Sequence, residues 1–395
     1  MQNLKLMQPS PLRVASEIAA TRRDFLRGAI GTLSMASVTR AVAAMQASSL
    51  LRPAQKTIVV TFGGGARDEE TFAEDGRENI PNLLHTLLPQ GTFFTQVVNA
   101  GILGHYVATA SIVTGYYERF DNFIAQAPPN PTLFEYFRKG LRRPSTDAWV
   151  IAPSNGFQRI GASNHTAFGP NFGAGVILPK RLVAVALRGR ALAESDRLSH
   201  LLQDSYEMPL YQPTHSAEDH ELHLEMLESV LQLSVRDFVQ HAKSLDSADE
   251  LSVYITGQLM KRHAPSLMML TLHDMDIAHS GAYSLYVDAI QRADRLCAEI
   301  WQMVQQDPEY KDRTTVYIMP DFGRDADDDP AGNGFQHHRT GGAMARTTWM
   351  LALGPHVRQN TVVERRVESI DLVPTIGCTL GFATAGGGKC LRELL

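Results

Sequence analysis

The sequence predicts an α/β protein, a three-layer αβα sandwich with a mostly parallel central sheet. Three observations support this fold class. Several short runs of β-branched and apolar residues have the continuous hydrophobicity of strands buried on both faces. Stretches with helical spacing separate most of these runs, as the crossovers of a parallel sheet require. Glycine, carboxylate and imidazole residues follow directly after several runs, where an open α/β sheet binds its ligands.

Composition and charge narrow the possible partners. The chain has 395 residues, of which 44% are apolar and 20% are charged, as is usual for a globular protein. A net charge of −5 provides no basic face, so we do not expect nucleic acid as a partner. The three cysteines, Cys297, Cys378 and Cys390, lack metal-binding spacing and allow one disulfide but no disulfide framework.

The N-terminal segment is typical of a twin-arginine export signal. Residues 21–27 (TRRDFLR) match that consensus, and a weakly hydrophobic segment, 28–38, precedes the small residues 41–43 (AVA). The apolar run is too short for a stable membrane span. We therefore expect a signal peptide at 1–43, a linker at 44–55, export by the twin-arginine machinery, and a periplasmic or extracytoplasmic location. The alternative is an amphipathic N-terminal helix.

The first predicted strand, Lys56–Phe62, runs into the three glycines at 63–65. Glycine allows the backbone to turn tightly and to approach an anion or a metal closely. No Gly-Lys-Ser/Thr follows, so this segment is not a P-loop. Residues 71–88 have helical spacing, and Gly91–Val98 is the second predicted strand.

The segment after the second strand is a candidate active-site turn. Residues 101–115 (GILGHYVATASIVTG) are bounded by glycines and rich in small and hydroxyl residues, as at the beginning of a helix. The helix dipole lowers the pKa of a hydroxyl at that end and favours bound anions. Thr109 is the preferred nucleophile because it lies nearer the turn than Ser111. The alternative is that these small residues merely pack in a tight helix.

The middle of the chain carries fewer signals. Residues 147–153 (DAWVIAP) predict a third strand, and 219–242 predict a helix. We interpret residues 157–262 as an insertion or cap within a domain that spans 56–395.

Two later strand ends carry the candidate metal ligands. A buried strand at 266–271 leads to Asp276 and His279, and the helical spacing from 286 to 304 follows. Another strand, 314–319, ends before Asp321, and His338 follows after a short loop. Carboxylate and imidazole groups suit Zn²⁺ or Mn²⁺. The alternative is an acidic surface loop with exposed histidines.

The order of these elements resembles the alkaline phosphatase superfamily, which includes sulfatases and phosphodiesterases. A further strand at 349–353 and the segment 369–375 (SIDLVPT) complete the resemblance, which covers about residues 56–382. The motifs that carry it are residues 111–115, 276–281, 314–324, 334–338 and 369–381.

The chain also departs from the family pattern. The aspartate that the family places after its first strand is replaced by the glycines at 63–65, for which Asp68 or Glu69 could substitute. The family's Asp-His pair is Asp321-Phe322, and the nucleophile spacing falls on His105.

The resemblance implies an exported metal-dependent hydrolase of small-molecule phosphate or sulfate esters. It implies that Asp276, His279, Asp321 and His338 bind one divalent metal ion, while Thr109 is the candidate nucleophile on its sequence position alone. His105 would then act as a base or as a further ligand. The alternative is a non-catalytic periplasmic binding or assembly protein that keeps the fold with a degenerate metal site.

Overall fold

The computed structural model describes residues 56–169, 171–187, 198–202 and 217–394. The expected signal peptide at 1–43 and linker at 44–55 lie outside the described residues.

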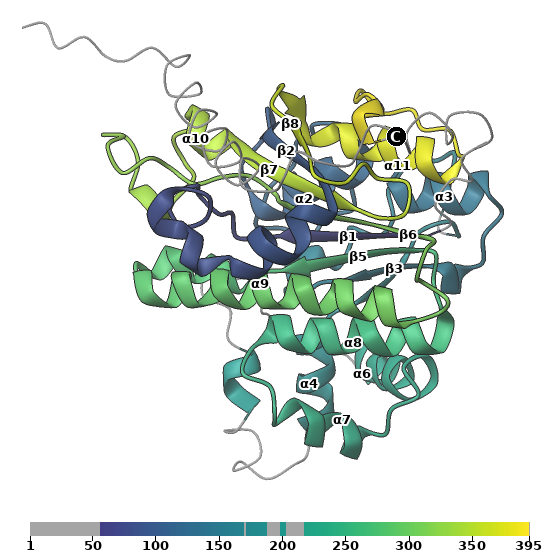
Figure 1. Cartoon of the computed structure of the whole chain (residues 1–395). Coiled ribbons are helices and arrows are strands. Elements are labelled where there is room, and N and C mark those ends of the chain that lie inside the picture. The colour runs from purple at the N-terminus through teal and green to yellow at the C-terminus, as the bar shows by residue number, and fades with distance from the viewer. Residues whose placement is uncertain (1–55, 170, 188–197, 203–216, 395) are drawn as a thin grey trace, which may run out of the picture.

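A nine-stranded sheet forms the middle layer of the described chain (Figure 1). Its order is β4-β3-β5-β1-β6-β7-β2-β8, and β9 also pairs with β2. Only β7 is antiparallel to its neighbours in this sheet, so the predicted mostly parallel sheet is confirmed. The strands are β1 Lys56–Phe62, β2 Gly91–Val98, β3 Ala148–Ile151, β4 Gly175–Ile177, β5 Leu267–Leu272, β6 Thr314–Pro320, β7 Thr347–Leu353, β8 Thr361–Val363 and β9 Val367–Glu368.

Helices cover both faces of the sheet, which gives the three layers (Figure 1). One face packs against α8 (Ala248–His263), α9 (Tyr283–Gln306) and the helical turns between β1 and β2. The other face packs against α2 (His105–Thr114), α3 (Leu133–Gly140) and α11 (Leu372–Leu380). Alternate residues of each strand enter the two cores, as expected for strands buried on both faces. The predicted αβα sandwich is therefore confirmed.

The register of the central strands places three loops at one edge of the sheet. Strand β1 lies between β5 and β6, and its last residue, Phe62, is level with Leu272 and Pro320. The loops that begin at Gly63, His273 and Asp321 therefore leave the sheet side by side.

The prediction of a single helix at 71–88 is wrong. The segment forms short turns, a 3-10 turn at Glu74–Asn79, a π turn at Leu83–Leu87 and a 3-10 turn at Leu88–Gln90. A Cβ at Gly76 would lie 2.4 Å from the backbone nitrogen of Thr71, so the chain folds back tightly there. Pro81, which has no N–H, then prevents a continuous helix.

The predicted helix at 219–242 is divided in two. Helix α6 (Ala217–Glu225) continues into a π turn at Met226–Val230, and α7 (Val235–Ala242) begins after a break. Gln232 has φ 50° within that break, and the Ser234 side chain caps α7 by accepting a hydrogen bond from the Asp237 N–H at 3.1 Å.

The region interpreted as an insertion contributes to the main sheet as well as lying outside it. Strand β4 extends the sheet edge beside β3, and α8 packs on β5 and α9. Helices α4 (Pro179–Leu187), α6 and α7 lie beyond α8 (Figure 1). The domain boundary at 157–262 stays a prediction.

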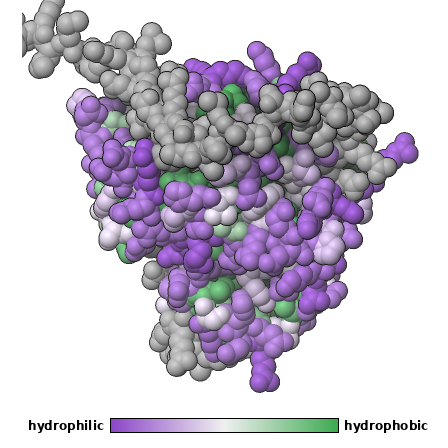
Figure 2. Space-filling view, viewed as in Figure 1, coloured by the Kyte–Doolittle hydropathy of each residue, from purple (hydrophilic) through white to green (hydrophobic). Residues whose placement is uncertain are grey.

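Among the described helices, none combines the length and the apolar character that crossing a membrane requires. The face in Figure 2 is mostly hydrophilic, with apolar residues in small separate groups.

Candidate metal centre

Five side chains named from the sequence meet at the edge where β1, β5 and β6 end. His105 is the first residue of α2, and Asp321 follows β6 directly. Asp276 and His279 belong to 3-10 turns at Asp274–Ser280, immediately after β5. His338 lies on the loop after the 3-10 turn at Gly334–Gln336. Residues far apart in sequence are thus brought together by the register of the strands.

The ligand atoms are spaced as around a single metal ion. Asp276 Oδ1 lies 3.0 Å from His105 Nε2 and 3.2 Å from His279 Nε2. His338 Nε2 lies 3.2 Å from His279 Nε2, and the three imidazoles offer nitrogens within 4.8 Å of one another. Four ligands at zinc-type bond lengths in a tetrahedron are separated by about 3.3–3.5 Å. Three imidazoles and one carboxylate therefore fit one divalent ion.

Two of these atoms are buried without a hydrogen bond among the described residues. His105 Nε2 and Asp276 Oδ1 lie within ion-pair distance of each other, but neither atom makes a hydrogen bond to a described residue. Their side chains are 7% and 4% exposed. A buried polar atom without a partner costs about 1–3 kcal/mol, more when charged. A bound cation would remove this cost for both atoms.

Asp321 has its oxygens engaged within the protein. Its Oδ2 lies 2.7 Å from His105 Nδ1, and its Oδ1 accepts a hydrogen bond from the Phe322 N–H at 3.0 Å. This is the arrangement in which a carboxylate orients a metal-binding histidine. His279 has a similar neighbour, because its Nδ1 lies 3.1 Å from Nδ1 of His337.

The beginning of α2 is built to place His105 at this edge. Asn122 Oδ1 accepts hydrogen bonds from the N–H groups of Tyr106, at 3.0 Å, and Val107, at 3.4 Å, which caps the helix. A Cβ at Gly104 would lie 2.5 Å from the Asn122 side chain, so only glycine allows this cap to approach.

The glycines after β1 leave no room for a carboxylate. A Cβ at Gly63 would lie 2.9 Å from the His273 ring, and one at Gly64 would lie 2.7 Å from the backbone nitrogen of Asp276. Any side chain here would therefore displace the loop that carries Asp276. Of the two substitutes considered from the sequence, Asp68 is buried, whereas Glu69 is 42% exposed and lies 3.9 Å from Arg67.

Arg324 was not recognised from the sequence, although it follows Asp321 by three residues. Its guanidinium is fully buried and donates hydrogen bonds to the carbonyls of Phe335, Gln336 and Met275, at 3.0, 3.2 and 3.4 Å. It also lies 3.5 Å from Asp276 Oδ1. Arg324 thus joins the loop that carries Asp276 to the loop that carries His338.

Burial and neighbouring charges set the protonation of the centre. Burial lowers the pKa of His338 well below its usual value and also lowers that of His279. Burial also opposes the charged forms of His105 and Asp276, but their mutual attraction outweighs it. The carboxylates of Asp321 and Asp276 raise the pKa of His105 to about 10. His105 in turn holds the pKa of Asp276 well below its usual value. Without a metal these carboxylates favour the imidazolium form of His105, from which a bound cation would displace a proton.

Thr109, the nucleophile named from the sequence, lies one turn along α2 from His105. It is fully buried, and its Oγ1 has no hydrogen-bond partner among the described residues. Ser111 is also buried and donates a hydrogen bond to the Val107 carbonyl at 2.8 Å.

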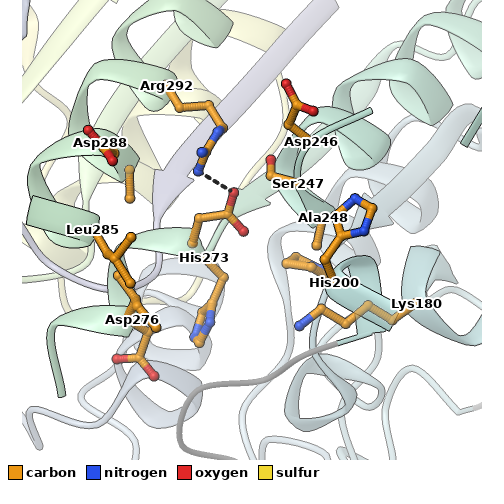
Figure 3. A pocket seen from close by; sticks show the side chains of 14 residues that line it. Lys180, His200, Asp246, Ser247, Ala248, His273, Asp276, Leu285, Asp288 and Arg292 are labelled. Carbon is orange, nitrogen blue, oxygen red and sulfur yellow. Dashed lines mark hydrogen bonds and ion pairs between the residues drawn. The ribbon is translucent and has the colours of Figure 1, made fainter. Parts of the chain in front are cut away.

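A cavity of about 370 Å³ adjoins the centre and is lined by its Asp276 and by His273 (Figure 3). Lys180 extends into the cavity from α4, and Arg292 reaches it from α9 (Figure 3). The Arg292 Nη1 lies 3.2 Å from Asp274 Oδ2. Burial lowers the pKa of Lys180 to about 8, against the attraction of Asp274 and other nearby carboxylates. The cavity therefore combines two cations, Lys180 and Arg292, with four carboxylates, Asp246, Asp274, Asp276 and Asp288, beside the candidate ligands.

Comparison with known proteins shows a likeness of fold without a likeness of sequence. No protein-family model and no curated protein matches the chain. Among solved structures, the chain is similar to the lipoteichoic acid synthase LtaP from Listeria monocytogenes, with a TM-score of 0.51 and 13% identity over 96% of this chain and 81% of that one. The phosphonate monoester hydrolase SpPMH from Silicibacter pomeroyi gives a TM-score of 0.50 and 16% identity, over 86% of this chain and 76% of that one.

A mutant of the alkaline phosphatase PafA gives a TM-score of 0.52 and 10% identity, over 88% of this chain and all (100%) of that one. The resemblance to the alkaline phosphatase superfamily inferred from the motifs is therefore confirmed for the fold. The activity has to be argued from the site.

Proposed function

We propose that this chain, which has the alkaline phosphatase-like fold, is a metal-dependent hydrolase of phosphate or sulfate esters. The observation that carries the proposal is the convergence of three imidazoles and one carboxylate at the carboxyl edge of the sheet. Two buried ligand atoms without hydrogen bonds lie at its middle. In open α/β sheets this edge is where ligands bind.

His105, Asp276, His279 and His338 are the proposed ligands, and Asp321 orients His105 from behind. This differs from the set drawn from the sequence, in which Asp321 was a ligand and His105 a base or a ligand. The reason is geometric, because His105 directs one nitrogen at Asp321 and the other at Asp276. A set with three imidazoles favours Zn²⁺ over Mn²⁺, which prefers oxygen ligands.

A bound ion would polarise the ester and lower the pKa of the attacking group. The protein supplies the rest of the site. Lys180 extends into the adjoining cavity, where its ammonium group would hold an anionic oxygen of the ester. Arg324 and Asp321 fix the loops and the ring that carry the ligands.

The exported location is part of the proposal. The twin-arginine motif at 21–27 and the small residues at 41–43 support export to the periplasm or another extracytoplasmic compartment. The substrate there would be a small-molecule ester, and the negative net charge gives no reason to expect nucleic acid.

The expected metal content is one divalent ion per chain, because the glycines after β1 exclude a further carboxylate from the centre. Metal analysis of the purified protein measures this directly. The same preparation should hydrolyse phosphomonoester, phosphodiester or sulfate ester model substrates, lose that activity with a chelator, and regain it with Zn²⁺. One bound ion without turnover of any ester would support the non-catalytic alternative, and no bound ion would contradict both the centre and the hydrolase.

A Thr109→Ala variant identifies the attacking group. If the Thr109 hydroxyl attacks the ester, its removal should reduce turnover at least ~100-fold, as expected for a catalytic group. The complete burial of Thr109 favours water as the attacking group, and we then expect the variant to keep its turnover. A Ser111→Ala variant is the matched control, because this buried hydroxyl already donates to the Val107 carbonyl and accepts from the Glu118 N–H.

A further inference from the structure

The C-terminal tail is held against α11 on both sides of Cys390. The Lys389 N–H donates a hydrogen bond to Asp371 Oδ1 at 2.7 Å, and the Leu391 N–H donates one to Thr375 Oγ1 at 3.0 Å. Leu391 is buried in the core on this face of the sheet. These contacts fix the position of Cys390 along the helix.

Cys378 is the helix residue that faces this part of the tail. It follows Thr375 by three positions on α11, so the two residues share one side of the helix. The thiols of Cys378 and Cys390 are both free and are close enough to interact. Cys378 is exposed and Cys390 is half-buried, so an oxidant can reach the pair.

We propose that Cys378 and Cys390 form a disulfide bond when the protein meets a disulfide-bonded thiol oxidant. The exposed thiolate of Cys378 attacks one sulfur of the oxidant, which releases one oxidant thiol and leaves a mixed disulfide. Cys390 loses its proton and attacks the Cys378 sulfur, which releases the second oxidant thiol. The two cysteines thus lose two electrons and two protons, and the oxidant is reduced to two thiols.

The order of these steps follows from the surroundings of the thiols. Burial, together with the neighbouring Cys378 thiol, raises the pKa of Cys390 to about 12, so Cys390 is poorly suited to begin the exchange. Cys297 is buried in α9 and cannot compete for the oxidant. The pair lies on the outside of an already folded domain, so the bond can form after folding, as export of a folded chain would require.

The bond would secure the tail to α11, where the tail also contacts the end of α2, the helix that presents His105. The Gly387 N–H donates a hydrogen bond to the carbonyl of Gly115, the residue at the end of α2, at 2.9 Å. The Tyr116 hydroxyl donates another to the Ala385 carbonyl. A cross-link at 378–390 closes a short loop around these contacts and restricts the unfolded chain.

The test compares the purified chain after treatment with oxidised glutathione and after treatment with a reductant. Each sample is denatured, alkylated with iodoacetamide and digested for mass analysis. We expect alkylation at Cys297 alone in the oxidised sample and at all three cysteines in the reduced one. A cross-linked peptide should join Cys378 to Cys390. The oxidised protein should melt about 3–6 °C higher than the reduced one.

Matched variants separate this bond from other redox effects. Cys378→Ser and Cys390→Ser should each abolish the difference in melting temperature between the two treatments, whereas Cys297→Ser should keep it. The wild-type comparison stands even if a variant folds poorly. Alkylation of Cys378 and Cys390 after oxidation, lasting glutathione adducts on either, or a cross-link between two chains would overturn the proposal.

Discussion

A His105→Ala variant is expected to lose its metal, with affinity at least about 100-fold weaker than that of the wild type. Even the outer carboxylate partner of a metal-binding histidine typically contributes 10–100-fold to affinity, and a ligand itself contributes more. The loss should be specific because His105 lies in the middle of the cluster, 3.0 Å from Asp276 and 2.7 Å from Asp321. Metal analysis after dialysis and titration calorimetry with Zn²⁺ measure it without any assay of activity.

Asp321→Asn is the variant that distinguishes an orienting residue from a ligand. Its amide oxygen can still accept the His105 Nδ1–H, so we expect affinity to fall only about 10–100-fold and the metal count to stay at one under saturation. His165→Ala, which removes an exposed imidazole that is not one of the proposed ligands, serves as the control. If Asp321→Asn lost the ion completely while His105→Ala retained it, the two assignments would have to be exchanged.

The different roles of Asp321 in the sequence-based and structure-based ligand sets show how much of the site the sequence could reveal. The runs after β5 and β6 identified Asp276, His279, Asp321 and His338 because ionisable residues directly after buried strands are unfavourable without a partner. Which groups face the ion depends on distances between residues more than two hundred positions apart, as between His105 and Asp321. No local pattern contains that information.

The fold could be predicted further than the site because its signals are local. Strands β1 and β2 have the bounds expected from their hydrophobic runs, since both faces are buried. The antiparallel direction of β7 depends on its pairing with β6 and β2, which hydrophobicity does not encode. The helical pattern at 71–88 failed for a related reason. The Asp294 carboxylate of α9 accepts hydrogen bonds from the N–H groups of Asn82 and Leu83, at 3.0 and 2.7 Å. This tertiary contact divides the segment 71–88.

An Arg324→Leu variant is expected to lower the free energy of unfolding by about 3–5 kcal/mol, the usual effect of removing one partner from a buried ion pair. The change leaves the carbonyls of Met275, Phe335 and Gln336 without their donor inside the protein. Urea denaturation monitored by circular dichroism measures the difference. Arg313→Leu is the control. That exposed arginine lies 3.7 Å from Glu309, and its removal should change the free energy of unfolding by no more than about 1 kcal/mol.

The same variant should also weaken metal binding, because Arg324 connects the loops of Asp276 and His338 through backbone carbonyls rather than through the ligands themselves. Arg324→Lys retains the charge but lacks the planar guanidinium that contacts both loops at once. The stability of this variant should therefore fall between those of the wild type and Arg324→Leu. A loss of stability with unchanged zinc affinity would mean that Arg324 supports the core under Tyr286, whose ring lies 5.4 Å from the guanidinium, and not the centre. A loss of both properties in parallel is the expected result, because one buried guanidinium fixes the spacing between two segments that must each deliver a ligand to the same point.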